Sequence, residues 1–178
     1  MKECYGGDIN KVMKLIKDGA DVNAKDIYGN PAIMRAARSN RADIIELLWK
    51  NGANVNVMVD KRRNNPLLLA SFQGSANAVK ALVKCGAYVN VKNQDEETPL
   101  MLACWIGSKD IVDTLLNTPT LKINEKYIWG STSLNIAIRR KKSSIVNILR
   151  QHGAKTAKEL EVKKLESNTG SSIKATAK

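Results

Sequence analysis

The 178-residue chain has little of what most catalytic sites require. It contains a single histidine, His152, and Cys4, Cys85 and Cys104 stand at unrelated spacings, so no cluster of metal ligands is evident. Gly6-Gly7 is not followed by the lysine and the serine or threonine of a phosphate-binding loop. These absences argue against an enzyme, and we expect no cofactor and no metal.

Long apolar runs are also absent. The longest are short pieces of amphipathic helices, so no transmembrane segment is predicted. The N-terminal Met1-Lys2-Glu3-Cys4 has no apolar stretch after its lysine, which argues against a secretory signal peptide. An odd number of cysteines is typical of reduced thiols. We therefore expect a cytoplasmic protein, with Cys85 and Cys104 buried and Cys4 as the candidate for exposure.

What the chain does contain is a short phrase that returns at a fixed interval. It reads Gly-Ala-Asp/Asn/Tyr-Val-Asn at residues 19–23, 52–56 and 86–90, so its glycines lie 33 and 34 residues apart. An apolar pair or triplet precedes each copy, and a segment of small and apolar residues stands further upstream. A constant period near 33 residues indicates a stack of one supersecondary unit.

Each part of this unit has a physical reason. Thr98 is placed to cap a helix whose first turn holds Pro99. The apolar residues Ile44, Ile45, Leu47 and Leu48 give a second helix one buried face. A glycine such as Gly52 ends that helix in a left-handed conformation at little cost. The predicted unit is therefore a helix, a turn, a second helix and an extended turn.

This pattern resembles the ankyrin repeat family. The matching segments are Thr98-Pro99-Leu100 with Ala103, the apolar pairs Ile111-Val112 and Leu115-Leu116, and the Gly-Ala-Asp/Asn-Val-Asn endings. The resemblance implies an all-α ankyrin-type repeat solenoid, built from helix-turn-helix units joined by β-hairpin-like loops. The repeat domain is expected at 1–154, with units at about 1–25, 26–59, 60–92, 93–126 and 127–154. The polar tail, 155–178, is expected to form a short helix followed by disorder.

Several positions depart from the family pattern. Side-chain hydrogen bonds of the family's histidine should be missing or altered, because that position holds Met34, Leu68, Met101 and Asn135. Arg63 and Glu96 replace tip glycines, which predicts less regular tips. Residues 117–121 replace a Gly-Ala ending and predict an atypical loop. The first unit is truncated, so we expect the helix at 9–17 to be the least stable.

Ankyrin-like stacks bind partners with their hairpin tips and with the exposed end of each first helix, and the repeat phase locates these places. They hold arginines and many of the chain's few aromatic residues, a composition typical of protein–protein hot spots. The alternative for Phe72 and Trp105 is shielding of the neighbouring first helix. The same phase assigns Trp49 to the core beside Leu48. The predicted partner-binding residues are Tyr28, Arg38, Arg62, Phe72, Trp105, Ile106, Trp129, Arg139 and Arg140.

Charge leaves more than one kind of partner open. The formal net charge is +12, and basic runs at 61–63 and 139–142 are interrupted by the acidic tip at 95–97. A basic groove for an acidic protein, nucleic acid or acidic lipid is one interpretation, with nucleic acid the weaker; a solvated surface is the other. We predict a monomeric, non-enzymatic protein-interaction module whose unknown partner protein could be acidic. Short basic tails on ankyrin-like proteins of intracellular bacteria add a further alternative, an effector delivered into a host cell.

Overall fold

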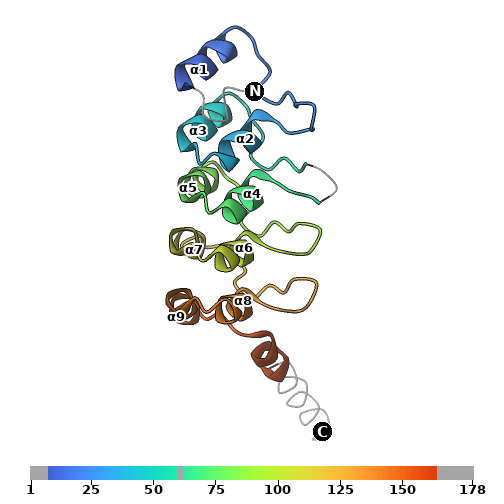
Figure 1. Cartoon of the computed structure of the whole chain (residues 1–178), viewed down its shortest axis with the longest axis vertical. Coiled ribbons are helices and arrows are strands. Elements are labelled where there is room, and N and C mark those ends of the chain that lie inside the picture. The colour runs from blue at the N-terminus through green and yellow to red at the C-terminus, as the bar shows by residue number, and fades with distance from the viewer. Residues whose placement is uncertain (1–7, 60–61, 164–178) are drawn as a thin grey trace, which may run out of the picture.

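The computed structural model describes residues 8–59 and 62–163, and this part of the chain is a stack of helices (Figure 1). Among the described residues, strand pairing is confined to two isolated bridges, between Lys25 and Pro31 and between Val59 and Asn64. Residues 157–163 are also helical. The predicted all-α repeat solenoid is confirmed. The helices of the repeat stack are α1 (Ile9–Lys17), α2 (Ala32–Arg38), α3 (Ala42–Lys50), α4 (Pro66–Gln73), α5 (Ala76–Lys84), α6 (Pro99–Ile106), α7 (Lys109–Leu116), α8 (Ser133–Arg139) and α9 (Ser143–Gln151).

The helices form two layers. Helices α2, α4, α6 and α8 make one layer, and α1, α3, α5, α7 and α9 make the other (Figure 1). The long loops before α2, α4, α6 and α8 project from the first layer, away from the second. We call the first layer the inner helices, and the surface formed by their exposed ends and the loop tips the inner face.

Small residues let the inner helices stack closely. Ala36, Ala70, Ala103 and Ala137 occupy matching places in the four inner helices and are fully buried. The helices of the second layer, which we call the outer helices, are amphipathic instead. In α3 the buried face is formed by Ile44, Ile45 and Leu48. The core therefore runs the length of the stack between the two layers.

The predicted cap of α6 is confirmed. The Thr98 hydroxyl accepts the backbone N–H of Met101 at 3.3 Å, and Pro99 lies in the first turn. Gly52, which follows α3, has the predicted left-handed backbone with φ of 87°. Local sequence chemistry thus sets where these helices begin and end.

The two tip positions that lack glycine keep a left-handed backbone. Arg63 and Glu96 have φ of 57° and 60°, the same left-handed region as the tip glycines Gly29 and Gly130. A non-glycine residue loses roughly 1–2 kcal/mol there. At the third tip the Asn93 side chain accepts the N–H groups of Asp95 and Glu97, at 3.0 and 2.9 Å, which holds the turn in shape.

Asparagines join each unit to the next, a feature that sequence interpretation missed. The side chain of Asn56 donates to the carbonyl oxygen of Gly86 and accepts the N–H of Tyr88, at 3.2 and 2.8 Å. Asn90 makes the same pair of bonds with Thr120 and Lys122, both at 2.8 Å. The loop at 117–121 therefore keeps the connection between units even though the repeated phrase is lost. Equivalent bonds start from Asn23 and Asn124.

Hydrogen bonding at the family's histidine position is altered, as expected. In α8 the Asn135 side chain accepts the backbone N–H groups of Thr132 and Ala157, at 3.1 and 2.8 Å. In α6 the Met101 sulfur is 3.5 Å from the N–H of Thr98. In α4 this position is Leu68, and the buried amide nitrogen of Asn65 has no hydrogen-bond partner among the described residues. Each substitute thus changes the local network in its own way.

Trp49 is a correction to the sequence interpretation. Its side chain is 45% exposed, whereas Leu48 beside it is buried. One step along a helix turns the side chain by about 100°, which carries Trp49 past the face that faces the core. The cysteines behave as predicted, since Cys85 and Cys104 are buried, and burial raises the pKa of the Cys104 thiol to about 12. Cys4 lies outside the described residues.

The two ends of the stack are built differently. Helix α1 packs against α3 and buries Val12 but leaves Met13 and Leu15 exposed; its predicted low stability stays a prediction. At the other end, the Glu159 carboxylate accepts the N–H of Thr156 at 2.7 Å and pairs with Arg150 at 2.8 Å, which lowers the pKa of Glu159 to about 2. The disorder expected further along the tail falls outside the described residues. No helix in the described ranges combines the length and apolar character that crossing a bilayer requires.

Candidate protein-interaction surface

One position of the repeat carries a column of large side chains along the inner face. Arg38, Phe72, Trp105 and Arg139 are each the seventh residue of their inner helix, in α2, α4, α6 and α8. All four are exposed. The column therefore reads arginine, aromatic, aromatic, arginine from one end of the stack to the other.

The two central members of the column help to enclose a cavity of about 580 Å³, which we call the aromatic pocket. Three inner helices and two loop tips contribute to it. Trp129, from the fourth tip, packs edge-on against Tyr127, with ring centroids 5.4 Å apart. Four predicted site residues meet here. The lining residues are Phe72, Glu97, Met101, Leu102, Trp105, Tyr127, Trp129, Ile136 and Arg139.

Two arginines from α8 and its end lie over the indole of Trp105. The guanidinium of Arg140 is 4.2 Å from the ring centroid, and that of Arg139 is 5.8 Å away. Arg140 also donates from Nε to the carbonyl oxygen of Trp105 at 3.3 Å. Cation–π contacts of this kind contribute about 0.5–1 kcal/mol each at exposed sites. We expect these contacts to restrict the orientation of the partly exposed Trp105 side chain.

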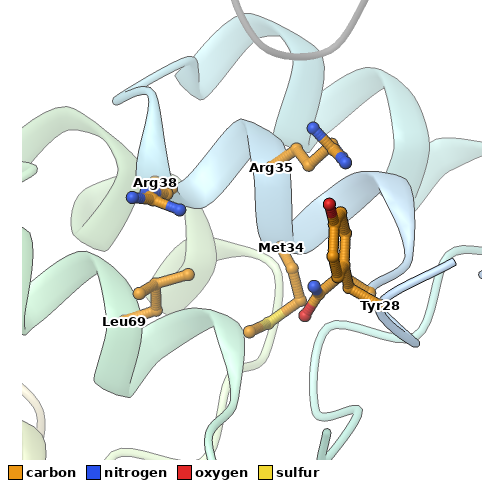
Figure 2. Close-up of a pocket in the computed structure, with 6 residues that line it drawn as sticks. Tyr28, Met34, Arg35, Arg38 and Leu69 are labelled. Atoms are coloured by element: carbon orange, nitrogen blue, oxygen red, sulfur yellow. The ribbon is translucent and has the colours of Figure 1, made fainter. Parts of the chain in front are cut away.

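A second cavity, of about 440 Å³, lies nearer the N-terminal end of the inner face, and we call it the arginine pocket. Figure 2 shows Met34 between Tyr28 on one side and Arg38 and Leu69 on the other. Its charged walls come from α2, and the side chain of Leu69 comes from α4. The lining residues are Tyr28, Asn30, Met34, Arg35, Arg38 and Leu69.

The two arginines of this pocket differ in their bonding. Arg35 donates from Nε to Asp26 at 3.0 Å, and the same carboxylate accepts the N–H groups of Asn30 and Tyr28. The hydrogen bond from Asn30 and the contact with Arg35 lower the pKa of Asp26. Arg38 is exposed and has no ion pair with any described residue. Its charge is therefore available to a ligand, whereas that of Arg35 is committed to the tip.

The remaining predicted residues line neither pocket. Arg62 is exposed on the second tip, where its carbonyl oxygen accepts the N–H of Gln94 at 3.0 Å. Ile106 is 39% exposed at the end of α6, close to Gly74. The structure thus gathers four of the nine residues in the aromatic pocket and two in the arginine pocket. Arg140 joins the first group through Trp105.

Several acidic groups close to the inner face are hydrogen-bonded or ion-paired within the protein, whereas Asp95 is exposed at the third tip. Glu97 accepts a hydrogen bond from the amide of Asn93 at 2.7 Å. Lys92 pairs with Glu125 and Glu96, at 2.8 and 3.0 Å, and these contacts raise the pKa of Lys92. In contrast, no described carboxylate forms an ion pair with Arg38, Arg139 or Arg140. The cations at the two ends of the column are therefore unpaired among the described residues, whereas Asp95 adds an exposed negative charge at the third tip.

In the described ranges, the candidate catalytic residues lie at the end of a helix and at a loop tip. These residues contain no cluster of three or more His, Cys, Asp or Glu that could hold a metal ion. His152 follows α9, and its Nδ1 lies 2.9 Å from the carbonyl oxygen of Ile148, which is a helix-end contact. In the acidic cluster at 95–97, Asp95 and Glu96 are exposed at a loop tip, whereas Glu97 is partly buried and lines the aromatic pocket.

Helix pairs that stack at a constant period near 33 residues define a repeat protein of the solenoid class. The family profile described as "Ankyrin repeats (3 copies)" matches residues 1–93 and again residues 67–159. The chain belongs to the ankyrin repeat family. Ankyrin repeats are generally protein–protein interaction modules, and the family is typically non-enzymatic.

Curated relatives share the repeat but are much longer proteins. The chain is 35% identical over 105 residues to the B-cell lymphoma 3 protein homolog of Mus musculus, covering 58% of this chain and 22% of that protein. It is 33% identical over 128 residues to alpha-latrotoxin-Lg1a of Latrodectus geometricus, covering 71% and 9%. It is 34% identical over 96 residues to the putative ankyrin repeat protein FPV031 of Fowlpox virus (strain NVSL), covering 53% and 28%. The alignments thus span less than a third of each relative.

Proposed function

We propose that the protein is a non-enzymatic module that binds a partner protein through the tips and helix ends of its inner face. The observation that carries this proposal is the convergence of Phe72, Trp105, Trp129 and Arg139 on one cavity. Tryptophan and arginine dominate protein–protein hot spots, which cluster in pockets of this kind. The contact residues of the proposal are Tyr28, Arg38, Arg62, Phe72, Trp105, Ile106, Trp129, Arg139 and Arg140.

Exposed apolar side chains at the two outermost full tips support the proposal. Ile27 and Tyr28 are 91% and 75% exposed in the first tip, and Ile128 and Trp129 are 58% and 75% exposed in the fourth. Apolar side chains gathered on one surface mark interaction sites. A nucleic-acid duplex or an acidic lipid head group would be bound mainly through its phosphates and would gain little from these apolar side chains.

Rigidity of the scaffold supplies the mechanism. The inner helices are fixed by fully buried alanines, and the loop tips are tied together by backbone bonds such as that from Ile128 to the carbonyl oxygen of Asp95 at 3.2 Å. A partner therefore meets side chains that are already in place, and little conformational entropy is lost on binding. A cytoplasmic location, a monomeric state and delivery into a host cell stay predictions from the sequence.

Affinity capture from native lysate tests the proposal with a double variant and a matched control. Phe72→Ala with Trp105→Ala removes two walls of the aromatic pocket, whereas Trp49→Ala removes an exposed tryptophan from α3, outside both pockets. The wild-type protein and the Trp49→Ala variant should capture the same partner, and chemical crosslinking should join that partner to residues of the inner face. The double variant should not capture this partner. Retention of that partner by a folded double variant would contradict the proposed site.

A further inference from the structure

We propose that the partner segment is an extended acidic peptide in which acidic, apolar, apolar and acidic side chains follow one another at every third position. This inference rests on the proposed function and names the chemistry of its ligand. It is read from the column of Arg38, Phe72, Trp105 and Arg139, one member per inner helix. The two apolar side chains enter the aromatic pocket, and the two carboxylates meet the arginines at either end.

Charge decides what the ends of the peptide carry. Arg38 at one end of the column, and Arg139 with Arg140 at the other, have no ion pair with a described carboxylate. The acidic side chains near the middle of the column belong to the third tip: Glu97 lines the aromatic pocket, where it accepts a hydrogen bond from Asn93, and Asp95 is exposed. A carboxylate brought to either end therefore gains an attraction that the folded protein does not satisfy itself.

The arginine side chains that lie over Trp105 also limit which kind of side chain can bind in the aromatic pocket. Aromatic walls can attract a cation, but the face of Trp105 is occupied by the guanidinium of Arg140 at 4.2 Å. A ligand cation placed there would lie beside a like charge and would be repelled. An uncharged apolar side chain gains from Phe72, Trp105 and Trp129 without that repulsion.

Spacing decides the conformation of the peptide. Packed helices lie about 8–10 Å apart, so adjacent members of the column are separated by about that distance. A polyproline-II chain rises about 3.1 Å per residue with about three residues per turn, and thus returns a side chain to the same face every 9 Å or so. The four side chains then fall at positions 1, 4, 7 and 10 of a segment of about ten residues.

A helical peptide could match the same pitch at every seventh residue, since about seven residues advance roughly 10.5 Å. Such a segment would need about 22 residues to meet all four positions. Polyproline II is a major conformer of unfolded chains, so a short acidic segment in that form loses less entropy on binding than a segment that must first form a helix. We therefore commit to the extended form.

Fluorescence anisotropy with synthetic peptides and the full chain tests the inference. The probe is a labelled peptide of about twelve residues, with aspartate, leucine, phenylalanine and aspartate at every third position and serine or proline between them. Replacing both aspartates by lysine, or changing the interval to two or four residues, should weaken binding at least about tenfold. The charge effect should shrink as salt rises from about 0.05 M to about 0.5 M.

Variants locate the peptide on the surface. Arg38→Glu and the pair Arg139→Glu with Arg140→Glu should each weaken binding of the aspartate peptide at least about tenfold and improve that of the lysine peptide. The controls Lys80→Glu, on the exposed side of α5, and Trp49→Ala should leave both unchanged.

Three results would overturn the inference: no binding of the aspartate peptide, equal binding of the lysine peptide, or tighter binding of a helical peptide with the seven-residue interval. Each of these results would overturn only the proposed peptide. The proposed function would still be supported if the Phe72/Trp105 double variant fails to capture the partner that the wild-type protein captures. Retention of the partner by that variant would instead remove the proposed site itself.

Discussion

The aromatic pocket and the arginine pocket occupy comparable places in the repeat but differ in what holds their side chains. In the aromatic pocket, Trp105 is covered by Arg140 and Trp129 is braced by Tyr127. In the arginine pocket, Arg35 is tied to Asp26, whereas Arg38 makes no ion pair with a described residue. The comparison shows that the position within the repeat determines where a side chain lies, whereas the residue type at that position determines its chemistry. We therefore propose that the aromatic pocket supplies most of the affinity, and that Arg38 at one end of the column and Arg139 with Arg140 at the other share the charge selection.

The largest expected effect is a loss of stability from a core substitution in α4, the helix that contributes to both pockets. Leu67 is fully buried, and Leu67→Ala should lower the free energy of unfolding by about 2–5 kcal/mol. Leu69→Ala is the matched control, since Leu69 is only partly buried and lines the arginine pocket. Denaturant titration measures both. Equal losses for the two variants would show that the stack does not depend on α4 as described.

The next effect separates the two pockets by affinity. Trp105→Ala should weaken binding of the captured partner by about 2 kcal/mol or more, because it removes a hot-spot side chain from a cavity wall. Tyr28→Ala should cost less, since Tyr28 is largely exposed and borders the arginine pocket. Isothermal calorimetry with the purified partner gives both values. A larger loss for Tyr28→Ala would reverse the assignment of affinity.

A smaller effect tests the bracing of Trp105. Arg140→Ala removes the guanidinium over the indole and the hydrogen bond to the Trp105 carbonyl, and should cost about 1 kcal/mol in partner binding. The order parameter of the Trp105 indole N–H, measured by NMR relaxation, should fall as well. If affinity falls and the indole stays equally ordered, the effect of Arg140 comes only from its own contact with the partner, and its contacts with Trp105 contribute nothing to binding.

The smallest effect concerns pH and the arginine pocket. The pKa of Asp26 is lowered from its ordinary value of 3.8 by its hydrogen bonds with Asn30, Arg35 and Tyr28. Its contribution to stability is fully present above pH 3.8 and is lost as pH falls through the lower folded value. Asp26→Asn should therefore lower the unfolding temperature at neutral pH, with a difference that narrows in acid. A difference that is constant with pH would show that the charge of Asp26 plays no part.

Much of the fold followed from the sequence because local chemistry encodes it. The Thr98 cap and the Gly52 helix end depend on neighbours within a few residues, and a 33-residue period is visible without any structure. The same period placed Phe72, Trp105 and Trp129 at positions that prove to share one cavity. The position of each residue within the repeat was sufficient for this prediction, because successive stacked units have closely similar backbones.

Features that depend on side-chain direction or on distant contacts could not be predicted. Trp49 was assigned to the core because it follows Leu48, yet one helical step turns it outward. Arg140 and Trp105 are 35 residues apart, and their contact depends on side-chain conformations in two units. The bonds from Asn56 and Asn90 to the next unit span about 30 residues in the same way.

The three tryptophans allow the central claim to be tested in one measurement. Each indole N–H gives its own NMR signal, and Trp105 and Trp129 line the aromatic pocket whereas Trp49 lies on α3, outside both pockets. On titration with the captured partner, we predict shifts of the Trp105 and Trp129 signals and an unchanged Trp49 signal. A shift of Trp49 alone, with the other two unchanged, would contradict the assignment of binding to the inner face.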